Sequence, residues 1–149
     1  MRPTLGIAVL VCGCSPEPEL VFIPGPSFSQ VVRISSSQGD APHVAVGQPL
    51  VLHAVRQSGP WVPARRTALA AGACWVGAQP PREEAEVSDN LRWVAEPEGA
   101  ATFNVRYRPD HTREVHFSAP GQYRLKASSS LWCGPPQESN AITVSVAPR

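Results

Sequence analysis

The turn near residue 120 constrains the fold of this chain more than any other feature of the sequence. Apolar and polar residues alternate up to Pro120-Gly121, and the alternation resumes at Tyr123. A period of two is typical of strands with one buried face, and Pro followed by Gly favours a tight reversal of the backbone. The segment therefore predicts a β-hairpin whose second strand points Tyr123, Leu125 and Ala127 into the core.

Short alternating runs of the same kind recur through the body of the chain. They lie at residues 30–35, 50–56, 91–96, 102–108, 114–117, 123–127 and 140–146. Turn residues separate the runs, 17 of the 149 residues are proline, and few windows repeat with a helical period. The pattern predicts an all-β antiparallel sandwich of about seven strands, with Trp93 as its central aromatic core residue.

The alternation of apolar and polar residues is interrupted at residues 57–90, a segment that contains both Cys74 and Trp75. Irregular connections of this length are uncommon in compact domains and are usually functional. We therefore expect a long loop between the second and third strands. Short helical turns at residues 67–73 and 82–87 are an alternative for parts of it.

The first fourteen residues have the character of an export leader. A cationic start at Arg2 precedes the apolar run 5–11, which is far too short to span a membrane. The sequence Val-Cys-Gly-Cys at 11–14 follows, and it resembles the end of a bacterial lipoprotein signal. This resemblance implies a signal peptide over residues 1–14 that ends at a lipidated Cys14. It also implies export to the periplasm or the cell surface, with a membrane anchor.

Residues 15–29 look like a spacer between this leader and the body of the chain. Four of these residues are proline, which favours an extended, polyproline-like chain. We therefore expect a Pro-rich tether over residues 15–29 and one domain over residues 30–149. Two alternatives remain open. Cys12 and Cys14 could lie in a buried first strand as core residues or metal ligands, and residues 20–23 could form a short edge strand.

Three phrases in the body of the chain resemble bacterial immunoglobulin-like (Ig-like) and PKD-like sandwich domains. They are Val-Gly-Gln-Pro-Leu at 46–50, Leu-Arg-Trp-Val at 91–94 and Phe-Ser-Ala-Pro-Gly-Gln-Tyr at 117–123. The resemblance covers roughly residues 31–146 and implies an Ig-like order of strands. The chain lacks the acidic-Gly motif that PKD repeats place after their Trp. Leu125 stands where antibody domains have their second cysteine.

Cys74 and Cys133 are the thiols that remain if Cys12 is removed with the leader and Cys14 carries lipid. Two cysteines in an exported protein most simply pair with each other. The Ig-like order that the resemblance implies places the loops containing Cys74 and Cys133 at the same end of the sandwich. We therefore expect a disulfide between them.

Three tryptophans lie in or beside the same two loops, namely Trp61, Trp75 and Trp132. Exposed aromatic side chains on loops often serve as anchors for a binding partner, so these residues are candidate binding residues. Packing against the disulfide is the alternative interpretation of all three.

The sequence carries no recognisable catalytic or cofactor-binding motif. The 13 Lys and Arg residues nearly balance the 12 Asp and Glu residues, so the bulk charge does not favour nucleic acid as a partner. Asp110, His111, Glu114 and His116 have side chains that can bind a metal. A turn and an exposed strand face bring such residues together by chance, so we expect neither a metal nor another cofactor.

These observations predict a lipid-anchored, extracytoplasmic Ig-like module with a non-catalytic binding or structural role and a protein or glycan partner. The chain is not predicted to be an enzyme. One alternative is an inhibitor that inserts the Trp-bearing loop into a target's cleft, which a stiff protruding loop would favour. Another is a metal-binding or enzymatic role at His111 and His116, which a cluster of His and carboxylate groups in a pocket would favour.

Overall fold

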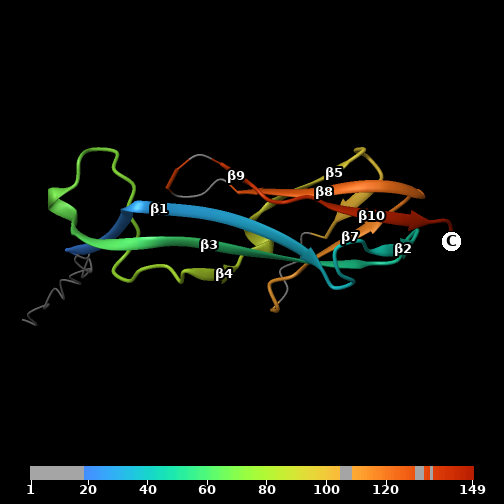
Figure 1. Ribbon diagram of the computed structural model, residues 1–149, viewed down its shortest axis with the longest axis horizontal. Coiled ribbons are helices and arrows are strands. Elements are labelled where there is room, and N and C mark those ends of the chain that lie inside the picture. The colour runs from blue at the N-terminus through green and yellow to red at the C-terminus, as the bar shows by residue number, and fades with distance from the viewer. Residues whose placement is uncertain (1–18, 105–108, 130–132, 135) are drawn as a thin grey trace, which may run out of the picture.

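The protein is an all-β sandwich, as the sequence predicts. The computed structural model describes residues 19–104, 109–129, 133–134 and 136–149. In these residues ten strands form two sheets that pack face to face (Figure 1). Two short 3-10 helices, η1 (Arg66–Ala68) and η2 (Ser88–Asn90), are the helical elements of this part of the chain.

The first sheet has the strand order β1-β3-β7-β6, and β4 pairs with β3 beside that path. Its strands are β1 (Leu20–Ser36), β3 (Leu50–Arg65), β4 (Glu84–Glu86), β6 (Ala101–Phe103) and β7 (Arg113–Phe117). The second sheet has the order β2-β10-β8-β5, and β9 pairs with β8. Its strands are β2 (His43–Ala45), β5 (Arg92–Glu96), β8 (Gly121–Ser129), β9 (Gln137–Glu138) and β10 (Ile142–Ala147). The strand pairs are antiparallel except for β2 with β10.

The hydrophobic core lies between the two sheets, where alternate residues of facing strands meet. Leu50 and Leu52 of β3 are fully buried, as are Leu125 of β8 and Val144 of β10. Burial of such side chains is the main favourable contribution to folding. The prediction that Trp93 belongs to the core is confirmed, since this residue is only 8% exposed.

The turn at Pro120-Gly121 does not close a hairpin, so that prediction is wrong. β7, before the turn, pairs with β3 and β6 in the first sheet. β8, after the turn, pairs with β10 and β5 in the second sheet. Alternation shows which face of a strand is buried but does not show which strand lies beside it. Here the two strands bury their apolar faces against each other across the core.

Tyr123 holds this crossover between the sheets. Its hydroxyl donates a hydrogen bond to the carbonyl oxygen of Ala119 at 3.0 Å, and its ring centroid lies 4.7 Å from that of Phe117. The predicted inward orientation of Tyr123, Leu125 and Ala127 is confirmed, because all three are buried.

β1 begins at Leu20 and pairs with β3, and it replaces most of the predicted tether. The prediction of a tether over residues 15–29 is therefore wrong from Leu20 onward, and so is the start of the domain at residue 30. The alternative of a strand at residues 20–23 is confirmed. Residues 15–18 lie outside the described part of the chain.

Proline and glycine are tolerated in β1 because of where they fall. β1 is at the edge of its sheet, so only one of its two rows of backbone groups pairs with a neighbouring strand. The register shifts between Pro24 and Ser29, and Pro26 falls inside this irregularity. Gly25 permits a close approach of the two strands, since a Cβ there would lie 3.0 Å from the carbonyl oxygen of Pro60.

β3 is longer than the sequence indicates, and the irregular segment after it is correspondingly shorter. β3 continues to Arg65, and β4 pairs with it, so the loop predicted over residues 57–90 is interrupted by regular structure. The helical turns considered at residues 67–73 and 82–87 are not formed, apart from the single 3-10 turn of η1. β4 occupies half of the second range.

β1 and β3 extend beyond the sandwich as a two-stranded ribbon (Figure 1). We use "ribbon" for residues 20–30 and 57–65, and "distal loop" for residues 66–83, which follow β3. The distal loop lies around the end of the ribbon, whereas the C-terminus lies at the opposite end of the molecule (Figure 1). One pair of strands thus carries this loop away from the main core.

Candidate functional site

A disulfide between Cys74 and Cys133 confirms the pairing expected from the sequence. The two Cα atoms are 5.4 Å apart, a normal separation for such a bond, and the residues are 59 positions apart in the chain. Cys74 lies in the distal loop, and Cys133 lies between β8 and β9. The bond therefore ties the distal loop to a strand connection of the second sheet.

Backbone hydrogen bonds hold the distal loop at two further places. Phe22 of β1 and Val76 exchange hydrogen bonds, with N···O distances of 3.1 Å from the Phe22 amide and 2.8 Å from the Val76 amide. The amide of Arg66 donates to the carbonyl oxygen of Glu19 at 2.9 Å. These contacts and the disulfide fix the loop against the ribbon, so its backbone has little freedom left to lose on binding.

Trp75 is the exposed tryptophan among those that the structure describes. It follows Cys74 directly and is 41% exposed. The guanidinium carbon of Arg66 lies 5.6 Å from the centre of its ring, which is within cation–π range. Trp75 is therefore a large, partly fixed aromatic surface of the kind that anchors binding interfaces.

The other two tryptophans do not join Trp75 in one site. Trp61 is half-buried, and its ring packs edge-on against Phe28 of β1 at a centroid distance of 4.8 Å. Trp61 therefore belongs to the packing of the ribbon. Trp132 lies outside the described residues, as does Cys14.

The distal loop has an uncharged and largely exposed surface. No residue from 67 to 81 is charged, and Ala68, Ala70 and Ala71 are exposed. In the described part of the chain the exposed large hydrophobic residues are Leu20, Val31 and Trp75, and two of these three lie near the end of the ribbon. The lack of charge is visible in the sequence. The exposure is not, because it depends on the ribbon that carries the loop away from the core.

A groove of about 490 Å³ lies along the ribbon close to the start of β4. Its lining includes the hydroxyl residues Ser27 and Ser29 and the acidic residues Glu83 and Glu84. Gln57 also lines it and donates from Nε2 to an Oε atom of Glu84 at 3.0 Å. Sequence reasoning missed this groove because residues 27–29 were assigned to a tether. Its walls suit polar or cationic groups, but they define no particular ligand.

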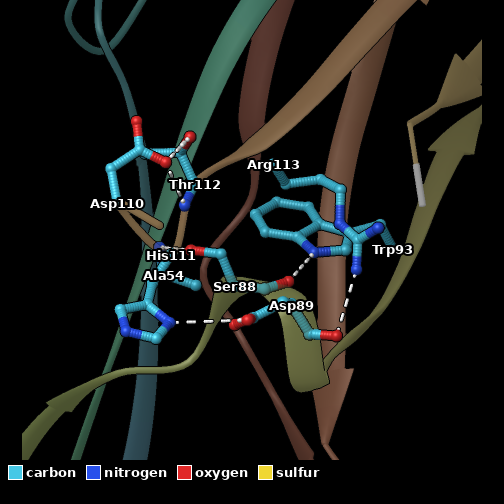
Figure 2. A network of polar contacts seen from close by, with 8 residues as sticks. All are labelled: Ala54, Ser88, Asp89, Trp93, Asp110, His111, Thr112 and Arg113. Carbon is cyan, nitrogen blue, oxygen red and sulfur yellow. Dashed lines mark hydrogen bonds and ion pairs between the residues drawn. The ribbon is translucent and has the colours of Figure 1, made fainter. Parts of the chain in front are cut away.

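Three of the four metal-capable residues singled out in the sequence lie in two separate pairs, one of which is completed by Asp89, whereas Asp110 accepts hydrogen bonds from Thr112. His116 Nε2 lies 2.7 Å from Glu114 Oε1 on the outer face of β7. His111 Nδ1 lies 3.4 Å from Asp89 Oδ2, beside η2 (Figure 2). Within the described residues, no three His, Cys, Asp or Glu side chains gather where they could hold a metal ion.

The network around Asp89 supports the fold (Figure 2). Ser88 is fully buried, and its hydroxyl oxygen accepts a hydrogen bond from the amide of Ala54 at 2.8 Å. The carbonyl oxygen of Ser88 accepts a hydrogen bond from Trp93 Nε1 at 2.8 Å. The Arg113 guanidinium donates to the carbonyl oxygen of Asp89 at 3.1 Å. Ser, Asp and His thus lie near one another, but the serine hydroxyl is shut away from solvent and fixes backbone.

No family model matches the chain, and a comparison with curated proteins finds no match either. The described residues contain no helix that is both long enough and apolar enough to cross a membrane. The distal loop with Trp75 is therefore the candidate functional site. The disulfide and the Phe22–Val76 bridge hold this loop in place.

Proposed function

We propose that this protein is exported, is held at a membrane by lipid on Cys14, and acts there as a non-catalytic binding or structural module. The disulfide between Cys74 and Cys133 supports export, because disulfides persist in oxidising compartments such as the periplasm and the cell surface. The Val-Cys-Gly-Cys sequence after an apolar run supports the lipid anchor.

The strand order supports an Ig-like relationship for the sandwich. If β2, β4 and β9 are set aside and the equally short β6 is kept, seven strands remain, and the first, second, fifth and fourth of them follow one another in one sheet. The third, sixth and seventh form the other sheet. Constant-type immunoglobulin domains divide their strands in this way, and they also have a Tyr at the start of the sixth strand that bonds to backbone upstream. Tyr123 occupies that place here.

The contact surface of this module is the distal loop, and the observation that carries this proposal is its fixed, exposed Trp75. A side chain that is 41% exposed on a disulfide-tied loop offers apolar area at a low cost in conformational entropy. A protein or glycan partner is the class that the sequence predicts. Among the described residues no three His, Cys, Asp or Glu side chains lie where they could hold a metal ion, so the metal-binding alternative at His111 and His116 has no comparable support.

The export and anchor proposals are tested together by comparing the wild-type chain with Cys14→Ser in detergent phase partitioning. The wild type is expected in the detergent phase, and the variant in the aqueous phase. Alkylation before and after reduction measures the disulfide in the same samples. Partitioning of both chains into the aqueous phase would refute the anchor, and freely alkylated Cys74 and Cys133 would refute export to an oxidising compartment.

An inhibitor is the second candidate function, and the protrusion of the distal loop favours it. A stiff loop beyond the main body of a domain has the shape needed to enter a target's cleft. In that case Trp75→Ala should weaken inhibition of the target strongly. Val31→Ala is the matched control, because Val31 has a similar exposed fraction, 44%, and lies on β1 away from the distal loop.

A further inference from the structure

The chain enters the ribbon at its distal end, next to the distal loop. Leu20 pairs with Arg65, and Glu19 accepts the hydrogen bond from the Arg66 amide. Cys14 lies five residues before Glu19. A chain of that length spans at most about 18 Å when fully extended. Lipid on Cys14 would therefore keep the distal end of the ribbon within that distance of the bilayer surface.

The surface at this end has the chemistry of a membrane interface. The large apolar side chains of Leu20 and Trp75 are 50% and 41% exposed, and the distal loop also exposes the uncharged residues Ala68, Ala70 and Ala71. Trp is the residue that sits at the headgroup level of bilayers. Arg65 and Arg66 lie beside this surface, and Glu19 is close to them. Arginines near an anionic bilayer are attracted to its phosphate groups.

From this juxtaposition we infer that the distal loop docks on the headgroup region of an anionic lipid bilayer. Trp75 and Leu20 enter the interface, and the exposed Arg65 faces the lipid phosphates. The inference rests on the proposed lipid anchor and names a bilayer as the partner of the proposed contact surface. It favours lipid over a protein or glycan at this site, because the anchor leaves too little height for a large partner beneath the loop. The ribbon then holds the sandwich away from the membrane.

The fluorescence of Trp75 tests this inference. The full-length lipidated chain is reconstituted into vesicles of phosphatidylcholine and phosphatidylglycerol, with and without bromine on the acyl chains close to the headgroups. Brominated lipid is expected to quench the wild type, and Trp75→Phe is expected to remove most of that quenching. Trp61→Phe is the matched control, because Trp61 is half-buried against Phe28, and this variant should keep the wild-type quenching.

A charge variant tests the role of Arg65 in the same vesicles. Arg65→Gln is expected to weaken docking roughly fivefold, which corresponds to about 1 kcal/mol for one cation near an anionic surface. Arg92→Gln, on the exposed side of β5 in the sandwich, should change nothing. Equal effects of the two variants would contradict the proposed orientation.

The outcomes separate this inference from the proposed function. Quenching that is the same in Trp75→Phe as in the wild type, with the chain still bound to the vesicles, overturns the docking and leaves the anchor intact. A chain that leaves the vesicles altogether overturns the anchor and the docking together. Crosslinking of two chains through their distal loops, without lipid quenching, would assign the surface to a second copy and also overturn the docking.

Discussion

The sandwich and the ribbon share the strands β1 and β3 but are held together in different ways. In the sandwich, Leu50, Leu52 and Ala54 of β3 are fully buried between the sheets. Further along the same buried face, Arg56 and Ser58 are 7% and 5% exposed. The apolar stripe therefore ends where the ribbon begins. Hydrophobic burial stabilises the first region, whereas the second needs other interactions.

Arg56 marks the boundary between the two regions. Burial lowers the pKa of its guanidinium, because desolvation disfavours the charged form. An isolated two-stranded ribbon is only marginally stable in water. The Cys74–Cys133 disulfide and the Phe22–Val76 bridge supply the missing constraint. The comparison teaches that a segment too thin to bury a large core can still be rigid if it is cross-linked.

The largest expected effect lies in the sandwich. Trp93→Ala should lower the free energy of unfolding by about 3–5 kcal/mol, because it removes a large buried ring and the hydrogen bond to Ser88. Urea unfolding followed by circular dichroism measures this change. A urea midpoint close to that of the wild type would mean that Trp93 of β5 is not a central residue of the core.

Removal of the disulfide should act mainly on the ribbon. The double variant Cys74→Ala/Cys133→Ala is expected to lose about 2–4 kcal/mol of stability, because the unfolded chain is no longer constrained. Amide hydrogen exchange should rise more in the ribbon and distal loop than in β7, β8 and β10, because the distal loop also loses the native cross-link that opposes its local opening. Equal increases in both regions would contradict the separation that we draw between them.

Ser88 belongs to the sandwich, where it bonds to Ala54 and Trp93, and its loss should have an intermediate effect. Ser88→Ala leaves the buried amide of Ala54 without its acceptor, which should cost about 1–3 kcal/mol. Thermal unfolding measures the change. Ser35→Ala, at an exposed position of β1, is the control and should behave as the wild type does.

The smallest effect is expected at the distal loop. Trp75→Ala should change the free energy of unfolding by no more than about 1 kcal/mol, since it removes an exposed ring and one cation–π contact. The same unfolding assay as for Trp93→Ala makes the comparison direct. Similar losses in the two variants would show that Trp75 is a packing residue and would remove the main support for a binding surface.

The sequence by itself determined the class of the fold and several of its buried residues. Alternation with period two is a local signal, so it located most of the strands and the inward orientation of Tyr123 and Leu125. The disulfide between Cys74 and Cys133 could also be predicted from the sequence. Two cysteines in a chain that is predicted to be exported have few other partners, and the resemblance to Ig-like domains placed their loops together.

Only the tertiary structure decided which strands lie side by side and where the ribbon begins. Local pattern cannot tell a hairpin from a crossover between sheets, because both bury the same faces of β7 and β8. Nor can it tell a Pro-rich tether from an edge strand, since Pro24 and Pro26 are acceptable only because one side of β1 needs no strand partner. The exposure of Trp75 has the same origin. It depends on contacts between residues far apart in the chain, which become visible only when the chain is folded.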